Sequence, residues 1–478
     1  MSEPGYDLAV VGGGLAGLVG ALRAAELGAR VALFETGAEH KYAANSRFTG
    51  GVFHVAFQDI LAPPEVLEEA ILAATGGFAD PALARALAQD AGRAVAWLAE
   101  QGADYGVGGP LPFMGHMLKP FSLREPGFAR HWPERGADRL LAELERRLLA
   151  RGGRFFRATR ARRLNMVSGR CRGLEVEHAD GSRRAVEASA VLLADGGFQG
   201  DRERVRQHLS PRPESLCTRG AGTGVGDGLA MAEAVGAKTL HLDRFYGHVQ
   251  CAEALTDERF WPYPILDIVA SAAIVVDARG QRFTDEGLGG VALANAIAAL
   301  EDPLSAFVIM DEPLWNRAGK EFLLPPNPYI ERLGVAVHRA PSLALLAEGL
   351  GMPAATLSKT VDDYNAALVT SRGACLRPPR SGQGSTLARA PAMITTQPFM
   401  AIRLCAGITY TMGGIAIDAH GRVLDRHEAA IPGLFAAGST TAGLEGGPNS
   451  GYVGGLAKAL VFGLRAAERA VEESARRG

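Results

Sequence analysis

Apolar residues near the start of the chain first form a short continuous run and then recur with helical spacing. Residues 6–11, YDLAVV, are an apolar, β-branched run typical of a buried strand, and the run breaks at three glycines. Residues 15–28 then repeat apolar positions at helical intervals, and residues 30–35, RVALFE, form a second strand-like run. The pattern predicts a β-α-β unit of about 30 residues.

Further along the chain, segments with helical periodicity alternate with short strand-like runs. The alternation indicates an α/β protein, and the last strand and helix come more than 400 residues after the first unit. The predicted elements are helices at 86–102, 136–152 and 452–473, and a glycine-rich turn that opens a helix at 222–237. They also include a hairpin turning at Asp180-Gly181 and buried strands at 190–194 and 434–439.

The pattern of predicted elements and the residue composition change between about residue 240 and residue 393. Aromatic residues, prolines and irregular segments replace the regular alternation there, which favours a second domain inserted into the first. We therefore predict a Rossmann-like domain from residues 1–240 and 394–478, with an inserted α+β capping domain at 241–393.

Composition narrows the class of protein. The chain is 47% hydrophobic and 21% charged, and its formal charge of −2 gives no electrostatic reason to expect nucleic acid or an anionic membrane as a partner. The five cysteines form no CxxC pair, which argues against a disulfide scaffold and a zinc site. The first residues lack a signal-peptide pattern and no apolar run is long enough to span a bilayer, so we expect a cytoplasmic protein without membrane insertion.

A dinucleotide-binding fingerprint lies between the first strand and the first helix. Gly12, Gly14 and Gly17 have the G-x-G-x-x-G spacing, and Glu35 ends the next strand. The glycines permit a tight turn and close approach of a pyrophosphate to the helix N-terminus, while the acid accepts from a ribose hydroxyl. Because strand, helix and acid are all in place, the fingerprint is specific for a dinucleotide.

The C-terminal segment indicates which dinucleotide is bound. In residues 431–455, IPGLFAAGSTTAGLEGGPNSGYVGG, a buried strand ends at a glycine and a second glycine pair opens the last helix. Such a segment brings backbone N–H groups and a helix dipole to the far, isoalloxazine end of FAD. An NAD-binding domain has no need of a cofactor segment this distant, so the arrangement favours FAD.

Segments spread over nearly the whole chain resemble the flavoprotein family of fumarate reductases, succinate dehydrogenases, tricarballylate dehydrogenase and 3-ketosteroid dehydrogenases. The segments are VVGGGLAGL, ANSRFTGG, LLADGGF, GTGVGDGLAMAEAVGA, QRFTDEG, TMGGIAID and IPGLFAAGSTTAGLEGG. The resemblance implies an FAD domain with an inserted capping domain, in agreement with the change of pattern and composition along the chain. It is specific for the family and much less so for one member.

The resemblance also implies a set of cofactor-binding residues. The residues that would hold the adenosine half are Gly12, Gly14, Leu15, Ala16, Gly17 and Glu35, and those that would line the flavin are Asn45, Ser46, Thr49, Gly50 and Gly51. Near the pyrophosphate or flavin would lie Gly196, Gly197 and Asp227. Facing the ribityl chain and the pyrimidine edge would be Gly438, Ser439, Gly454 and Gly455.

Two departures from the family pattern bear on the cofactor. Ser439 stands where an acid is common, and a serine still bonds a ribityl hydroxyl. Members with covalent flavin carry a histidine about six residues before the glycine pair that Gly50 and Gly51 match; Ala44 and Asn45 occupy that region here. The resemblance therefore implies non-covalent FAD, with His40 and His54 as ordinary surface or pocket histidines.

Three further departures lie at the substrate end. The dicarboxylate enzymes use an arginine soon after the segment that matches RFTDE, but here no arginine or lysine follows Glu286 until Lys320. They place a histidine before TMGG and an arginine before the last glycine pair, and here these positions hold Tyr410 and Tyr452. Only His248 matches a carboxylate-binding residue.

A pocket that replaces charged groups with phenols suits a ketone better than two carboxylates. A tyrosine donates to a carbonyl or enolate oxygen, and its phenolate accepts an α-proton. We therefore predict an FAD-dependent dehydrogenase that desaturates the carbon pair beside a carbonyl in a cyclic or steroid-like ketone. Tyr410 and Tyr452 are its candidate catalytic residues, and His248 or the nearby Arg244 would hold a carboxylate if the substrate has one.

Several neighbouring residues are expected to have structural roles. Tyr246 and Tyr263 are interpreted as packing residues of the cap, and Arg282 and Glu286 as a pair that braces it.

Two other functions remain open at this point. One is a polycarboxylate dehydrogenase or reductase similar to tricarballylate dehydrogenase or fumarate reductase, and the other is a non-catalytic flavin-binding subunit. The sequence has no haem or iron–sulfur spacing, so electrons would leave to oxygen, a quinone or a separate redox partner.

Overall fold

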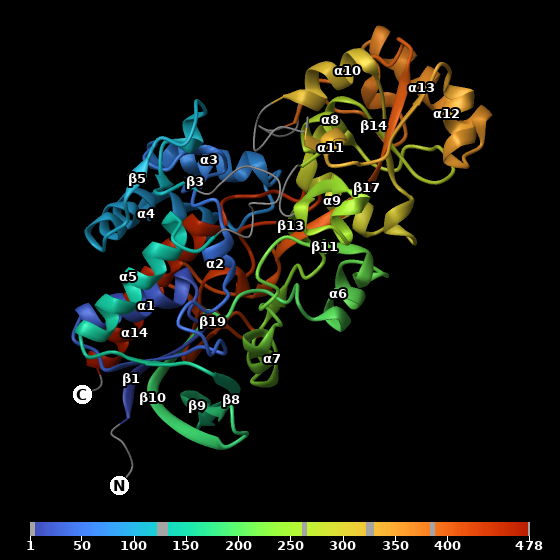
Figure 1. Cartoon of the computed structure of the whole chain (residues 1–478). Coiled ribbons are helices and arrows are strands. Elements are labelled where there is room, and N and C mark those ends of the chain that lie inside the picture. The colour runs from blue at the N-terminus through green and yellow to red at the C-terminus, as the bar shows by residue number, and fades with distance from the viewer. Residues whose placement is uncertain (1–4, 122–131, 261–264, 322–328, 383–387, 477–478) are drawn as a thin grey trace.

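The computed structural model describes residues 5–121, 132–260, 265–321, 329–382 and 388–476. Within these residues the longer strands form a mixed sheet of eight strands and a second sheet of six. The predicted α/β class is confirmed. Helices pack around both sheets, and the two sheets lie toward opposite ends of the molecule (Figure 1).

The predicted β-α-β unit is the centre of the first sheet. Strand β1 (Tyr6–Val11) leads through helix α1 (Leu15–Glu26) to β2 (Val31–Phe34), which pairs with β1 in parallel. On its other side β1 pairs in parallel with β10 (Arg183–Leu193), and β10 with β20 (Ala430–Ala436). Strands buried on both faces are near-continuous apolar runs, which explains why their sequences show no alternation. The topology brings the C-terminal strand beside the N-terminal unit.

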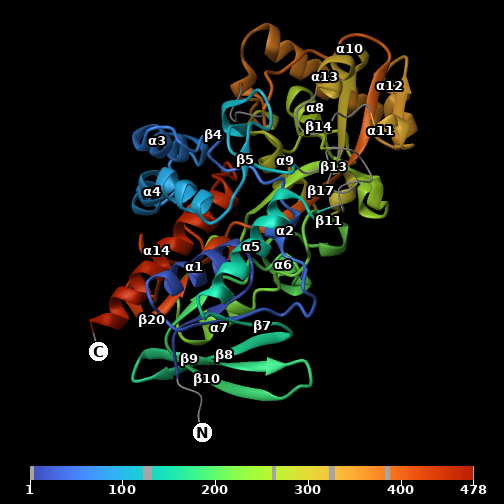
Figure 2. The same cartoon turned by 60° about the vertical axis from the view of Figure 1, so that its left-hand side comes forward.

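Helices α1, α5 (Gly136–Ala150) and α14 (Gly455–Ala475) pack side by side against this sheet (Figures 1 and 2). At the far end of the molecule from the second sheet, β8 (Thr159–Val167) and β9 (Arg170–His178) pair with the first half of β10 as an antiparallel ribbon. Strand β10 therefore belongs to two arrangements, exposed in its first half and buried in its second.

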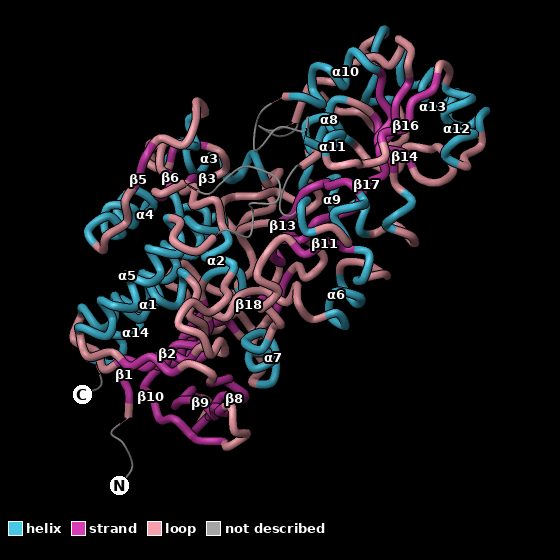
Figure 3. Tube along the Cα trace, viewed as in Figure 1, coloured by secondary structure: helices cyan, strands magenta, loops and turns pink. Residues whose placement is uncertain are grey.

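The second sheet is built around one long strand, β17 (Phe399–Thr411), which extends from the capping elements to the first sheet (Figure 3). Its first half pairs with β15 and β16, and its second half with β11 and β13. The strands and helices of this part are β11 (Leu216–Thr218), β13 (Phe245–Cys251), β14 (Ile274–Val276), β15 (Phe307–Asp311), β16 (Val337–Ala340), α8 (Asp267–Ala272), α9 (Gly290–Ala298), α10 (Glu312–Arg317), α11 (Tyr329–Arg332), α12 (Leu343–Leu350) and α13 (Ala354–Val369).

The apolar core is largely shared between the two sheets. One large cluster fills the first sheet and its helices and continues past β13 to α8, α9, α10 and one face of β15 and β17. A smaller, separate cluster lies between β14, β15 and α12–α13. The domain limits at residues 240 and 393 stay a prediction, because the second sheet takes β11 and β17 from outside that interval. The remaining elements are α2 (Asn45–Phe48), β3 (His54–Val55), β4 (Gln58–Asp59), α3 (Pro64–Ala74), α4 (Pro81–Glu100), β5 (Tyr105–Gly106), β6 (Met117–Leu118), β7 (Arg154–Phe156), α6 (Arg202–His208), α7 (Asp227–Ala234), β12 (Thr239–Leu240), β18 (Gly414–Ile415) and β19 (Arg422–Leu424).

Candidate active site

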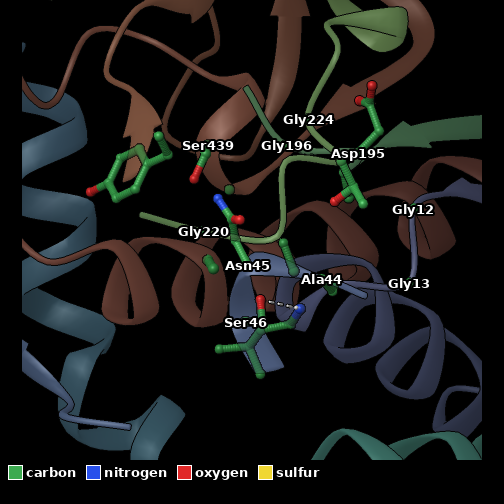
Figure 4. A pocket seen from close by; sticks show the side chains of 18 of the residues that line it. Gly12, Gly13, Ala44, Asn45, Ser46, Asp195, Gly196, Gly220, Gly224 and Ser439 are labelled. Carbon is green, nitrogen blue, oxygen red and sulfur yellow. Dashed lines mark hydrogen bonds between the residues drawn. The ribbon is translucent and has the colours of Figure 1, made fainter. Parts of the chain in front are cut away.

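A cavity of about 820 Å³ opens where the first sheet meets the second. The turn after β1, the start of α1, helix α2, the end of β10, the end of β17 and the start of α14 all contribute to its wall. In Figure 4, Gly12, Gly13 and Asp195 lie on one side, and Asn45, Ser46 and Ser439 lie nearer the middle. Segments that are far apart in the sequence therefore build one site.

The glycine turn predicted from the sequence forms one end of this cavity. Gly12 has a φ of +98°, which favours glycine, and Gly12 and Gly14 line the cavity. Gly17 lies behind the turn, where an added Cβ would sit 1.9 Å from the carbonyl oxygen of Gly12. Gly17 thus allows α1 to pack closely on the turn, and its effect on a ligand is indirect.

Glu35 has a structural role at the end of β2 as well as a place in the cavity wall. Its Oε2 accepts from the Gly13 amide at 2.8 Å, and its Oε1 accepts from the Gly37 amide at 2.7 Å. These bonds fix the carboxylate beside the glycine turn. A carboxylate oxygen has a second lone pair, so Glu35 still has acceptor capacity for a ribose hydroxyl.

Helix α2 joins the turn to the second sheet. Ser46 Oγ accepts from the Leu15 amide at 3.0 Å (Figure 4), while Asn45 donates through Nδ2 to the Thr409 carbonyl at 2.9 Å. Asn45 Oδ1 accepts in turn from the Ala221 amide at 2.8 Å. The two side chains hold the cavity walls at a fixed separation.

Two aspartates lie at the glycine-turn end. Asp227 forms a two-point ion pair with Arg160 of β8, with distances of 2.6 and 2.8 Å. Asp195 lies two residues past the end of β10, and its buried Oδ1 has no hydrogen-bond partner among the described residues. Burial raises the pKa of Asp195 to about 7. The motif analysis did not single out Asp195, although it lies within the LLADGGF segment.

Most of the predicted cofactor residues line the cavity. Those outside its wall are glycines whose role is in backbone packing, such as Gly197, where a Cβ would lie 2.2 Å from Thr411 Oγ1. The residues that line it are Gly12, Gly14, Leu15, Ala16, Glu35, Asn45, Ser46, Thr49, Gly50, Gly196, Asp227, Gly438, Ser439 and Gly455; those that do not are Gly17, Gly51, Gly197 and Gly454.

The cavity fits a dinucleotide with two polar ends. Helix α1 begins at one end and α14 at the other, so two sets of helix N-terminal amides point into the same space. Three buried polar atoms without partners in the described residues, Asp195 Oδ1, Gln199 Oε1 and Thr440 Oγ1, lie in this part of the fold. The helix amides are donors that suit the pyrophosphate and the pyrimidine oxygen of FAD, while the two acceptor oxygens in the wall, those of Asp195 and Gln199, suit hydroxyl and N–H groups of a cofactor.

The other end of the cavity is aromatic. Tyr246 stacks on Tyr452 with ring centroids 3.9 Å apart and 15° between the planes, and Tyr410 lies 5.2 Å from Tyr246. The pairing of β13 with β17 is irregular after Tyr246, so the extra residue on β17 is Thr409. A bulge turns adjacent side chains toward the same face, which explains why Thr409 and Tyr410 both line the cavity.

The hydroxyl of Tyr410 is bound to a buried ion pair. It lies 3.0 and 3.1 Å from the two carboxylate oxygens of Glu445, and Lys458 Nζ lies 2.7 Å from Glu445 Oε2. Burial alone would raise the pKa of Glu445, but Lys458 and two backbone amides outweigh it and the pKa is lowered. Glu445 is thus ionised, and Tyr410 must donate its proton to it.

The phenols of Tyr410 and Tyr452 stay protonated. Burial raises the pKa of both tyrosines well above the ordinary value. The charge of Glu445 raises the pKa of Tyr410 further, and the nearby Tyr246 hydroxyl does the same for Tyr452. The phenolate role considered from the sequence is therefore disfavoured for these two residues, and the role of hydrogen-bond donor is favoured for Tyr452.

His248 belongs to a hydrogen-bonded chain. Its Nδ1 lies 2.6 Å from Asp267 Oδ2 and its Nε2 lies 3.0 Å from the Tyr246 hydroxyl. Burial lowers the pKa of His248, while Asp267 opposes the shift. The imidazole is neutral, so it lacks the charge that the predicted carboxylate-binding role would use. Tyr246, which the sequence indicated as a packing residue, lines the cavity.

Other histidine and aromatic side chains complete this end. His54, Phe57 and Phe113 line the cavity, and His54 contacts Tyr452 edge to face at 5.5 Å. Burial lowers the pKa of His54 to about 4, so it is also neutral.

Arg219 is a cavity residue that no motif pointed to. It is 8% exposed, lines the cavity and donates from Nη1 to Thr409 Oγ1 at 3.0 Å. Its positive charge contributes to lowering the pKa of His248. A cation in this position is a candidate carboxylate ligand, and only its proximity in space could have revealed it.

Arg244, the arginine chosen from the sequence, lies outside the cavity wall and bonds the Gly447 carbonyl and Asp243. Arg282 and Glu286 form a buried ion pair of the cap, as predicted, while Tyr263 lies outside the described residues.

Comparison with known proteins agrees with this geometry. Residues 7–452 match the family described as FAD binding domain. The chain is 27% identical over 98% of its length to the fumarate reductase (cytochrome) of Shewanella frigidimarina, covering 77% of that protein. It is 30% identical to 4-oxocyclohexanecarboxylate 2-dehydrogenase of Sinomonas cyclohexanicum over 55% of this chain and 47% of that protein.

A solved structure has the same fold. The 3-ketosteroid-Δ4-(5α)-dehydrogenase of Rhodococcus jostii RHA1, in complex with 4-androstene-3,17-dione, superposes with a TM-score of 0.71 at 21% identity, covering 98% of this chain and 97% of that one. Among the described helices, none has the length and apolar character to cross a membrane. The chain belongs to the FAD binding domain family of the fumarate reductase and succinate dehydrogenase type, and it is an FAD-dependent oxidoreductase that acts on CH–CH bonds.

Proposed function

We propose that this enzyme desaturates the carbon–carbon bond beside the carbonyl of a cyclic ketone that carries one carboxylate. The observation that carries the proposal is the phenolic end of the cavity, where Tyr246, Tyr410 and Tyr452 gather within ring contact of one another. Phenols suit the oxygen of a ketone, because they donate a hydrogen bond without bringing a charge.

The charges at this end match one carboxylate better than two or three. Among the described residues of the cavity wall, the lysines and arginines are Arg160 and Arg219, and Arg160 is paired with Asp227 beside the β8–β9 ribbon. The two histidines at the aromatic end, His54 and His248, are neutral. Arg219 is therefore the one candidate cation there, which disfavours a polycarboxylate.

The Sinomonas relative supports this substrate class, since its name gives a cyclic ketone with a single carboxylate. The fumarate reductase relative supports chemistry on a carbon–carbon bond. We regard the forward reaction as a dehydrogenation. Its electrons would pass to oxygen, a quinone or a separate redox protein.

The residues of the cavity divide the work of this reaction. The glycine turn, Asn45, Ser439 and the start of α14 would hold FAD, which when bound would supply the hydride acceptor. Tyr452 donates to the carbonyl oxygen, which acidifies the α-hydrogen. Tyr410 stays protonated, donates its hydrogen bond to Glu445, and forms part of the wall beside the substrate.

Anaerobic reduction of the bound flavin tests the function. We expect 4-oxocyclohexanecarboxylate to bleach the flavin band and yield the enone, and acid precipitation to release the FAD into solution. Keto-steroids, cyclohexanone, succinate, tricarballylate and citrate complete the panel. Bleaching by the polycarboxylates alone would favour the fumarate reductase type of reaction. If none of these compounds bleaches a flavin that light reduces readily, a non-catalytic flavin subunit becomes the better reading.

Substitution of Arg219 tests how the carboxylate is held. Arg219→Gln should raise the Kd for 4-oxocyclohexanecarboxylate roughly 10- to 100-fold, the scale of one hydrogen bond to a charged group. The Kd for cyclohexanone, which has no carboxylate, should stay within a few-fold. Arg244→Gln is the matched control, because Arg244 lies outside the cavity wall. Equal changes for both ketones would show that Arg219 supports the pocket and does not bind the carboxylate.

A further inference from the structure

A chain of three polar side chains leads from the cavity into the protein interior. The Tyr246 hydroxyl faces His248 Nε2 at 3.0 Å, and His248 Nδ1 faces Asp267 Oδ2 at 2.6 Å. Tyr246 and His248 line the cavity, whereas Asp267 lies behind them and is 3% exposed. We propose that Tyr246 is the residue that removes the α-proton, and that His248 and Asp267 form the relay that accepts the hydroxyl proton of Tyr246.

The neighbours of His248 determine which nitrogen is protonated. Asp267 Oδ1 accepts from the Val249 amide at 2.8 Å, which fixes its carboxylate. The other oxygen, Oδ2, faces Nδ1, so the imidazole proton lies on Nδ1 and donates to Asp267. Nε2 then keeps its lone pair and accepts the hydroxyl proton of Tyr246. This orientation is the one needed for proton transfer from Tyr246 to the ring.

Electrostatics keep His248 ready to accept a proton. Burial and the charge of Arg219 lower the pKa of His248, and the carboxylate of Asp267 acts in the opposite direction. The ring is therefore neutral at rest, and the imidazolium formed in the reaction is stabilised by an adjacent carboxylate.

Tyr246 differs from Tyr410 and Tyr452 in the group that its hydroxyl meets. Tyr410 already donates its proton to Glu445, and burial keeps the phenol of Tyr452 protonated. Tyr246 is the one with a neutral ring nitrogen at its hydroxyl. The Tyr246 ring also stacks on that of Tyr452, with ring centroids 3.9 Å apart. The residue that donates a hydrogen bond to the substrate carbonyl and the residue that accepts the α-proton therefore lie side by side. The carbonyl oxygen and the α-hydrogen of a ketone are similarly close.

The step rests on the proposed desaturation and balances as follows. The α-proton moves to the Tyr246 oxygen while the Tyr246 proton moves to His248 Nε2. The electron pair of the α C–H bond becomes the new C=C bond, and the hydrogen of the β-carbon leaves as hydride to the flavin. The carbon pair is oxidised by two electrons, the flavin is reduced by two, and the proton resides on His248.

Stopped-flow bleaching of the FAD-loaded enzyme by 4-oxocyclohexanecarboxylate tests the relay. Tyr246→Phe should slow bleaching about 10²- to 10⁴-fold, the range for general base catalysis. His248→Gln should slow it as well, and the double variant should be no slower than the slower single variant, because the residues act as a unit. Tyr105→Phe is the control: it loses a buried hydroxyl outside the cavity wall and should bleach at the wild-type rate. Bleaching of Tyr246→Phe within a few-fold of wild type overturns the proposal.

A spectroscopic arm needs no substrate. In ¹⁵N-histidine-labelled enzyme, the signals missing from His248→Gln identify His248. We expect a protonated Nδ1 and a bare Nε2, with Tyr246→Phe shifting the Nε2 signal alone. A proton on Nε2 would overturn the relay even if ketones bleach the flavin. Failure of the wild type to react with any ketone, with the expected ¹⁵N pattern intact, would count against the proposed function and leave the relay standing.

Discussion

Replacing Lys458 with methionine is expected to lower the free energy of unfolding by about 3–5 kcal/mol. Lys458 is 1% exposed and Glu445 is fully buried, so the substitution leaves a carboxylate in the interior without its cation. The remaining partners of Glu445 are two backbone amides and the Tyr410 hydroxyl, and all three are neutral. Urea unfolding of the FAD-loaded protein at pH 7.5, followed by tryptophan fluorescence, measures the change.

A surface pair supplies the control for this experiment. Lys238 and Glu428 are also 2.7 Å apart, but they are 30% and 72% exposed. Lys238→Met should therefore cost less than about 1 kcal/mol. The double substitution Lys458→Met with Glu445→Gln should recover part of the loss, since it removes the uncompensated charge. A cost for Lys458→Met no larger than that for Lys238→Met would contradict the importance of this ion pair.

The flavin-free protein is expected to lose about 3 kcal/mol of stability between pH 5 and pH 8 because of Asp195. Burial raises the pKa of this carboxyl to about 7, and Asp227 and Glu35 add to the shift from its ordinary value of 3.8. Between these two pKa values the folded state binds the proton and the unfolded state does not. The stabilisation is therefore fully present below pH 3.8 and is lost as the pH rises to 7.

Asp195→Asn should remove this part of the pH dependence and make the flavin-free protein more stable than wild type at pH 8. Urea unfolding at pH 5 and pH 8 measures both effects. Asp104→Asn is the control, because Asp104 is an exposed partner of Lys119, and its pH dependence should match wild type. The same slope in Asp195→Asn and wild type would show that Asp195 ionises freely in the fold.

Local patterns were sufficient to predict the framework of the fold. The β1–α1–β2 unit and helix α14 follow from runs of adjacent residues, since burial on both faces or on one helical stripe leaves a direct trace in the sequence. The glycine turn and the start of α14 were placed in the site for the same reason. Their backbone conformations demand glycine at fixed spacings.

The chemistry of the aromatic end could not be predicted in the same way. Tyr246 and His248 are two residues apart, but their partner Asp267 comes from a helix 19 residues later. The orientation of Tyr410 depends on the bulge at Thr409 and on Glu445, 35 residues away. Such directions follow from tertiary packing, so the sequence indicated which tyrosines lie near the site but not which base or acid each one meets.

Arg219 illustrates a related limit. Its neighbours in the sequence form a loop after β11 with no catalytic motif, and Arg244 stood closer to the recognisable segments. In the fold, the pairing of the Arg219 amide with the Ile408 carbonyl brings its side chain beside Thr409. A backbone hydrogen bond between residues almost 190 positions apart in the sequence therefore decides which arginine reaches the cavity.

The length of β17 has a mechanical consequence. Its 13 residues span about 40 Å. The first part of the strand pairs with β15 and β16, and the rest pairs with β13 and β11. A strand paired on both sides resists bending, so a displacement of the capping elements would rotate the far end of β17 as well. Tyr410 lies one residue before that end. A movement of the cap would therefore change the orientation of the Tyr410 ring in the cavity, although the cap lies far from it.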